Sequence, residues 1–166
     1  RSIYYNANTS NIETITYNIS SEFGFAPNTG MYALEMSKTG KIKDSSKEIM
    51  QFHSAFGDAF TMPTYDAEND RYFAKQKRSN IVRIVTQKDE TPIGEIALDI
   101  AAAGAKFDDI SDNFVAYTGS KGEELALLDL DHKAFLVFDL TGKFIAKSAI
   151  PKGIKLRAKN YYNGLG

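Results

Sequence analysis

The segment AFLVFDLTGKF, residues 134–144, has the pattern of a β-hairpin. Apolar residues fill its first half, a Thr-Gly-Lys triplet follows, and a second apolar stretch begins at the final Phe. Aromatic and β-branched residues favour strands, and glycine beside polar residues favours a tight turn. MYALEMSKTGKI at 31–42 has the same arrangement, and IVRIVTQKDETPI at 81–93 has it with a longer turn. The three segments therefore predict three copies of one hairpin.

The spacing of these hairpins is regular. Ile42, Ile93 and Phe144, the first residues after the three turns, are 51 residues apart in both intervals (93 − 42 and 144 − 93). A second hairpin signal lies upstream of each, with a tyrosine in its first strand. These tyrosines are 48 and 52 residues apart (65 − 17 and 117 − 65): Tyr17, Tyr65 and Tyr117. Two landmarks with nearly the same period predict an internal repeat of four strands per unit.

The repeat predicts an all-β fold made of four-stranded antiparallel units of about 51 residues. Four short strands per unit is the plan of a β-propeller blade. We expect units at about 11–50, 58–100 and 106–150, with 151–166 as the start of a further unit, and one domain over residues 1–166. A β-trefoil, which also has three four-stranded repeats, is the alternative fold.

Three blades are fewer than the four to eight that usually close a propeller. Residues 1–8 have the pattern of the end of a preceding unit, and residues 151–166 that of the opening of another. We therefore expect either that the chain is part of a longer propeller or that further copies complete the ring. The exposed edges of an incomplete ring would favour association, since unpaired strand edges template pairing.

The composition excludes several classes of function. The 166 residues are 43% hydrophobic, which is enough for a core, and carry a net charge of −1, which gives no general attraction to nucleic acid. The absence of cysteine excludes disulfides, thiol catalysis and cysteine-ligated zinc. No apolar run reaches 18 residues, so the sequence predicts no membrane-spanning helix.

The segment 134–147, AFLVFDLTGKFIAK, resembles the outer hairpin of six-bladed propellers with NHL-type repeats. All three units fit this pattern, although Glu90-Thr91-Pro92 replaces Thr-Gly-Lys in the second. The chain as a whole resembles the six-bladed, TolB-like propeller proteins that bacteria of the Bacteroides type export as lipoproteins. The resemblance implies an extracytoplasmic (periplasmic or cell-surface) protein with a binding or scaffold role, and it implies no catalytic residues.

One acidic cluster is a candidate metal site. Asp108, Asp109 and Asp112 lie within five residues, before the first strand expected in the third unit. Carboxylates in a loop can bind Ca²⁺, but this ion takes six to eight oxygen ligands and three carboxylates do not supply them. In lactonase-type propellers, carboxylates from several blades converge on one metal, and Asp109 and Asp112 could occupy such places. Turn and capping roles are the alternative, and we expect no cofactor beyond this open Ca²⁺ site.

The other polar candidates favour structural roles. The two histidines, His53 and His132, lie in different units without metal-ligand spacing, and we expect His132 to be solvated in a tight turn. Gly119-Ser120-Lys121-Gly122 is typical of a turn. A basic cluster is expected to be a solvated hairpin tip: Lys75, Lys77, Arg78 and Arg83.

Taken together, these patterns predict a non-catalytic binding or scaffold propeller that recognises a protein, peptide or glycan. The alternative is a metal-dependent hydrolase of the lactonase or esterase type. That alternative depends on the three aspartates, so the sequence favours a non-enzyme without excluding an enzyme.

Overall fold

The computed structural model describes residues 3–16, 30–51, 55–57, 61–88, 91–107, 110, 115–119 and 122–155. These residues form twelve strands and no helix. The first sheet contains β1 (Ile3–Asn6), β2 (Asn11–Thr16), β3 (Gly30–Met36) and β4 (Ile42–Gln51). The second contains β5 (Thr64–Asp66), β6 (Arg71–Lys75), β7 (Ile81–Val85) and β8 (Gly94–Ala97). The third contains β9 (Ala116–Tyr117), β10 (Glu124–Asp129), β11 (Ala134–Asp139) and β12 (Phe144–Ala149).

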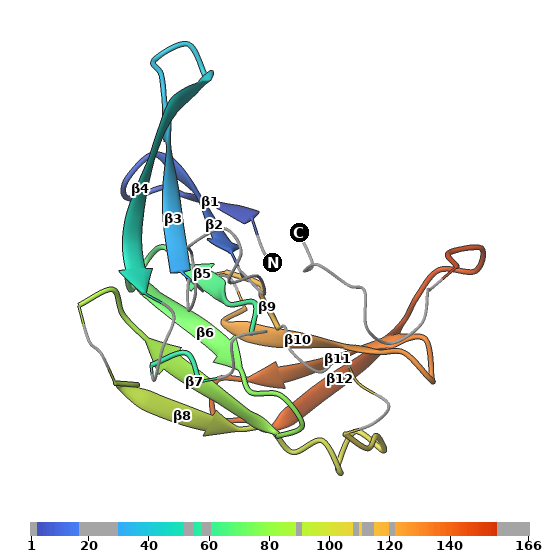
Figure 1. Ribbon diagram of the computed structural model, residues 1–166. Coiled ribbons are helices and arrows are strands. Elements are labelled where there is room, and N and C mark those ends of the chain that lie inside the picture. Colours follow the sequence, from blue (N-terminus) through green and yellow to red (C-terminus); the bar gives the residue numbers. More distant parts are fainter. Residues whose placement is uncertain are drawn as a thin grey trace, which may run out of the picture.

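Every sheet is an antiparallel meander in which neighbouring strands pair in chain order. The predicted all-β fold with propeller-like blades is confirmed (Figure 1). Three separate sheets of this kind are compatible with part of a propeller, and they do not form the barrel of a β-trefoil. The landmark residues are equivalent, since Ile42 and Phe144 begin β4 and β12 and Ile93 directly precedes β8.

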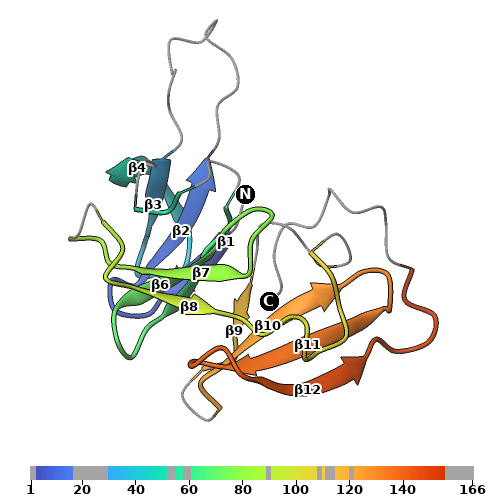
Figure 2. The same cartoon turned by 90° about the horizontal axis from the view of Figure 1, so that it is seen from below.

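The sheets are arranged around their first strands. β5 contacts both β1 and β9, and the backbone N–H of Tyr117 donates to Thr64 Oγ1 at 3.4 Å. Figure 1 shows β1, β5 and β9 towards the middle of the molecule and the fourth strands at its periphery, and the second sheet lies between the other two in Figures 1 and 2. We call the contact of the first and second sheets the 1–2 seam, and that of the second and third the 2–3 seam.

The 2–3 seam contains the main hydrophobic core. Large apolar side chains from both sheets interdigitate there, together with residues of the connection between them. The buried members are Phe73, Val82, Ile96, Leu98, Ile100, Ala103, Ala105, Ile110, Val115, Leu125, Leu127, Leu136 and Phe138. Fully burying a side chain of the size of leucine or phenylalanine contributes about 1.5–3 kcal/mol, so this seam is a principal source of stability.

Two equivalent turns keep the same geometry in the first and third sheets. The N–H of Gly40 donates to Ser37 O and that of Gly142 to Asp139 O, both at 3.0 Å. Both glycines have positive φ, +76° and +89°, which glycine adopts without steric cost. The predicted Thr-Gly-Lys turns are therefore confirmed.

The predicted start of the first unit is wrong. Ile3–Asn6 does not end a preceding unit but forms β1, paired with β2 through Tyr5 opposite Ile12. The Asn6 side chain closes the intervening turn, because its Oδ1 accepts the N–H groups of Asn8 and Thr9 at 2.9 and 3.2 Å. The hairpin expected after Tyr17 and the strand expected at 22–25 lie outside the described residues, as do residues 156–166 of the expected further unit.

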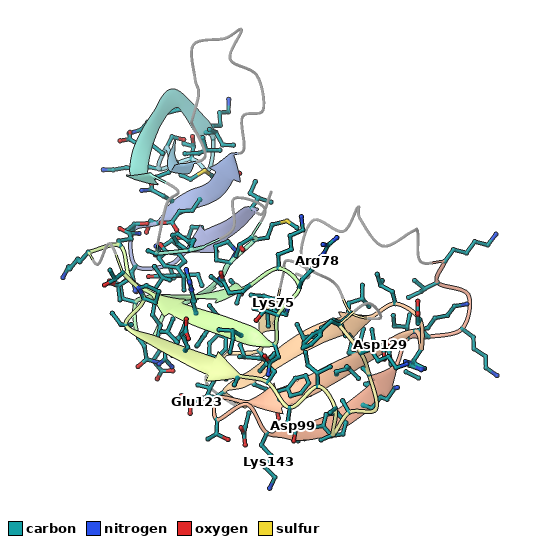
Figure 3. The ribbon with its side chains drawn as sticks, turned by 60° about the horizontal axis from the view of Figure 1, so that its bottom comes forward. Lys75, Arg78, Asp99, Glu123, Asp129 and Lys143 are labelled. Carbon is teal, nitrogen blue, oxygen red and sulfur yellow. The ribbon has the colours of Figure 1, made fainter. Side chains whose placement is uncertain are left out.

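The basic cluster is only partly a solvated tip. Lys77 and Arg78 are exposed in the turn between β6 and β7. Lys75, in contrast, is only 1% exposed, and its Nζ donates to Gln76 O at 2.8 Å. Figure 3 shows Lys75 in the interior of the molecule. The prediction is wrong for this residue because it belongs to β6, where the second sheet is covered on both faces.

Candidate functional site

A groove of about 340 Å³ opens between the first strands of the second and third sheets. Its walls come from the ends of β5 and β9 and from the turns that follow them. The lining residues are Tyr65, Asp66, Ala67, Glu68, Tyr117, Thr118 and Gly119. Strands β5 and β9 are adjacent, so their carboxyl ends bring residues that are about fifty positions apart in sequence to one place.

Asp66 organises the floor of this groove. Its carboxylate is buried and accepts hydrogen bonds from the turn: Oδ1 from the Glu68 N–H at 3.2 Å, and Oδ2 from Asn69 Nδ2 at 2.9 Å and Arg71 Nε at 2.8 Å. Burial alone would raise the pKa of Asp66. The hydrogen bonds from Asn69 and Arg71 outweigh it and hold the pKa below its ordinary value. Asp66 therefore stays ionised and fixes the shape of the β5–β6 turn.

Tyr65 links this turn to the first sheet. Its hydroxyl donates to Asp70 Oδ1 at 2.7 Å and accepts from Asn8 Nδ2 at 2.9 Å. The same Asn8 amide also donates to Ala67 O at 2.7 Å. Burial and the Asp70 hydrogen bond raise the pKa of Tyr65 to about 12, so its phenol is neutral at ordinary pH. One wall of the groove is thus held by the turn between β1 and β2.

Tyr117 forms the opposite wall. Its ring packs against that of Phe73 with centroids 5.1 Å apart. Burial, followed by the negative charges of Asp66 and Glu123, raises the pKa of Tyr117. Its hydroxyl is buried without a hydrogen-bond partner among the described residues. The exposed part of an aromatic ring supplies a flat contact surface, which suits sugars, peptide groups and other aromatic rings.

A second polar constellation lies in the 1–2 seam. Glu13 is fully buried, and its carboxylate accepts from Asn6 Nδ2 at 2.7 Å and from the Tyr72 hydroxyl at 2.9 Å. Gln87 Nε2 donates to the Tyr72 hydroxyl at 2.7 Å. Burial is the main reason that the pKa of Tyr72 is raised. The network joins two sheets through neutral donors, and its enclosure in the seam makes it structural rather than a ligand site.

The predicted metal candidates cannot be placed, because Asp108, Asp109 and Asp112 lie outside the described residues. Within the described ranges, no group of three or more His, Asp or Glu side chains has the geometry to hold a metal ion. His53 also lies outside them. His132 occupies the predicted turn, where its Nδ1 is 2.8 Å from Oδ2 of the buried Asp129 and its side chain is 47% exposed.

Other turn predictions are confirmed where the structure describes them. Gly119 and Gly122 belong to the turn between β9 and β10, in which the Gly122 N–H donates to Gly119 O at 3.2 Å. Asp129 and Asp139 close turns through backbone N–H groups, as expected for aspartates at strand ends. In the described part of the chain, no helix is both long and apolar enough to cross a membrane.

Sequence reasoning missed the groove itself. It treated Tyr65 and Tyr117 as landmarks of the repeat and did not predict that they line one groove between two sheets. One available signal was that Tyr5-Asn6 and Tyr65-Asp66 each precede a four-residue turn. This match would have aligned β1 with β5 and placed the paired turns of the first two sheets at one end of the axis.

Comparisons with known proteins place the chain in no family. No protein-family model matches it, and no curated protein matches its sequence. A solved structure with some likeness is the crystal structure of a nidogen/laminin complex, with 14% identity and a TM-score of 0.48. That match covers 90% of this chain and 47% of the other, so the chain spans about half the length of the chain that it matches. A likeness at this level assigns neither a family nor a function.

Proposed function

We propose that the chain is a non-catalytic binding scaffold that holds a peptide segment, protein loop or glycan in the groove between β5 and β9. The observation that carries this proposal is the opening lined by Tyr65 and Tyr117. Its Tyr65 wall is held by a hydrogen bond from Asn8 in the neighbouring turn, and its Tyr117 wall packs against Phe73. A rigid groove with aromatic walls can bind a ligand without rearranging, which lowers the entropic cost of binding.

The charges around the groove favour a ligand that donates hydrogen bonds. Asp66 and Glu68 line it, Glu123 acts on Tyr117 from the third sheet, and Arg71 is the nearby cation. The Arg71 guanidinium is held by Asp66 and stacks over the Phe73 ring at 5.0 Å. The remaining carboxylates leave an excess of acceptors, which suits sugar hydroxyls or the amides and basic side chains of a peptide.

The resemblance to exported six-bladed propellers supports the same type of role. The six-blade total, the extracytoplasmic location and the class of ligand are parts of this proposal. The described residues offer no observation that favours the metal-dependent hydrolase, because its three aspartates lie outside them.

A groove-filling substitution tests the proposal. The chain would be screened against arrays of oligosaccharides and of 15-residue peptides, and affinities would be measured by calorimetry. We expect a bound member whose affinity falls at least tenfold in Ala67→Trp, because the new ring fills the groove. Ala101→Trp, at an exposed turn position away from the groove, is the matched control and should bind normally. Absence of any bound member, or equal binding by Ala67→Trp, would overturn the proposal.

A further inference from the structure

Each sheet has one face towards the preceding sheet, here called its backward face, and one towards the following sheet, its forward face. In the 2–3 seam, the forward face of the second sheet presents Phe73, Val82 and Ile96, all at most 5% exposed. The backward face of the third sheet covers them with residues such as Leu136 and Phe138. This seam shows how two consecutive sheets of this chain fit together.

The forward face of the third sheet has no described sheet against it. Strand register places Ala126 opposite Val137 and Val137 opposite Ala146 across this face, and Phe135 lies on the same face two residues away. Ala126, Phe135 and Val137 are partly exposed and Ala146 is exposed. The residue of the second sheet that corresponds to Ala126 is Phe73, which is fully buried. The row of Ala126, Val137 and Ala146 is therefore small and open. The next row on this face, Leu128 and Phe135, packs against Met62, and Leu128 is only 2% exposed.

The backward face of the first sheet also has no described sheet against it, but its side chains are large. Register aligns Tyr5 with Ile12 and Ile12 with Leu34 across three strands. Tyr5 is 59% exposed, and Ile3, on the same face of β1, is 68% exposed. Exposed aromatic and aliphatic side chains gathered on one sheet face are unusual for a solvent-facing surface and mark an interaction site.

We propose that two copies of this chain associate head to tail, so that the forward face of each third sheet covers the backward face of the other copy's first sheet. The small row of Ala126, Val137 and Ala146 leaves room for the large row of Tyr5, Ile12 and Leu34, which is the complementarity that packed sheets need. The contact would form twice around a twofold axis and close a ring of six sheets, leaving no uncovered sheet face of this type.

The turns at the outer edge of the sheets, here called the rim, differ in what they contact. In the 2–3 seam, the Gly142 turn contacts the end of the second sheet, where the Asp99 N–H donates to Gly142 O at 2.8 Å. Figure 3 shows Asp99 and Lys143 together at this edge. The equivalent Gly40 turn has the same geometry, yet among the described residues no atom beyond its chain neighbours lies within 4 Å of the position that a Cβ would take.

The rim also limits how strong this association can be. After the second sheet, the Leu98 N–H donates to Asn80 O, and after the third sheet the Ile150 N–H donates to Lys133 O in the same way. Leu98 and Ile150 are therefore equivalent, and so are the residues that follow them, Asp99 and Pro151. Proline has no N–H to donate to the partner's Gly40 turn. The association therefore depends on the apolar faces, and we expect a dissociation constant of about 1–100 µM, at the weak end for specific protein interfaces.

Sedimentation equilibrium of the 166-residue chain from 1 to 500 µM tests the proposal. We expect a concentration-dependent shift from the 18.4 kDa monomer to twice that mass and no further. A monomer at every concentration, which is expected if the natural cover is a different sheet, would overturn the proposal. So would growth beyond the dimer, since it indicates open-ended edge pairing.

Two face variants make the test specific. Tyr5→Glu and Val137→Glu should each weaken dimerisation at least tenfold, whereas Ile93→Glu, at a residue that is 56% exposed away from both faces, should not. Circular dichroism would establish that each variant is folded. An equimolar mixture of Tyr5→Glu and Val137→Glu should dimerise more strongly than either alone, because the mixed dimer retains one unaltered contact. No difference between the mixture and the separate variants would contradict the head-to-tail geometry.

Discussion

The two seams of this molecule are built from different chemistry. In the 2–3 seam, leucine, phenylalanine, valine and isoleucine side chains from two sheets bury one another. The 1–2 seam also buries apolar side chains such as Ala33 and Val85. It adds a buried carboxylate, Glu13, bonded to Tyr72, and the Asn8 amide joins the adjacent turns. The apolar seam gains stability from buried area, whereas the polar seam fixes one relative position of its sheets because its hydrogen bonds require it.

The largest effect is expected from opening the apolar seam. Phe138 is fully buried and its ring meets that of Phe144 edge-on, with centroids 5.8 Å apart. Phe138→Ala should lower the free energy of unfolding by about 3–5 kcal/mol, because it leaves a cavity between the sheets. Urea denaturation measures this loss. Ile93→Ala, at an exposed residue, is the control and should change stability by less than about 0.5 kcal/mol.

The two Thr-Gly-Lys turns give a matched pair that isolates the 2–3 contact. A Cβ on Gly142 would lie 2.0 Å from Ala97 O, whereas one on Gly40 would meet, in the part of the chain that the structure describes, no atom within 4 Å beyond its chain neighbours. Both substitutions to alanine carry the cost of positive φ, about 1–2 kcal/mol. Gly142→Ala should cost about 1–3 kcal/mol more, because Ala97 must move. Equal losses of unfolding free energy in the two variants would show that this turn does not approach the second sheet closely.

The polar seam should respond through coupling rather than through size. Glu13→Gln keeps the volume but replaces one acceptor by a donor, and Tyr72→Phe removes the hydroxyl that donates to Glu13. Each should cost about 1–3 kcal/mol, since a buried partner loses its hydrogen bond. The double variant should be less destabilised than the sum by about 0.5–3 kcal/mol.

A second double-mutant cycle, which pairs Tyr72 with Glu35 instead of Glu13, serves as the control for the coupling between Glu13 and Tyr72. Glu35 is a partly exposed carboxylate that pairs with Lys43, so Glu35→Gln combined with Tyr72→Phe should be additive. Additivity in the Glu13 cycle as well would mean that the two side chains do not meet in the 1–2 seam.

The smallest effect is expected in how the free energy of unfolding falls at acid pH. The pKa of Asp66 is lowered from 3.8 in the folded protein, so this residue stabilises the fold above that value and the contribution is lost as pH falls through the folded pKa. Asp66→Asn should flatten the decrease of stability below about pH 4. Asp139→Asn is the comparison: the pKa of Asp139 is also lowered, chiefly by Thr141, but at an exposed turn where solvent screens the charge. A steeper decrease at acid pH in Asp66→Asn than in the parent would contradict the assigned direction.

The sequence predicted the structure within each sheet, but it did not predict the contacts between sheets. The period linking Ile42, Ile93 and Phe144 predicted three four-stranded sheets, because turn residues and strand alternation are local signals. The start of the first sheet was misjudged because the alignment relied on Tyr17 instead of the Asn6 turn.

Contacts between sheets depend on residues that are far apart in sequence, and alternation does not say which partner a face will meet. Glu13 and Tyr72 are 59 residues apart, so neither their hydrogen bond nor the groove at Tyr65 and Tyr117 has a local signal. The burial of Lys75 has the same origin, because it depends on the cover of the second sheet rather than on its position in a hairpin.

Cross-linking within single molecules tests most directly whether the sheets follow one another around a common axis. The chain has no native cysteine, so cysteine pairs can be introduced cleanly. Asn8→Cys with Ala67→Cys spans the 1–2 seam near the axis, and Asp99→Cys with Lys143→Cys spans the 2–3 seam at the rim. With a short bismaleimide at low protein concentration, mass spectrometry of digested monomers should find both intramolecular cross-links. Recovery of neither cross-link from folded monomer would contradict the arrangement of consecutive sheets packed face to face.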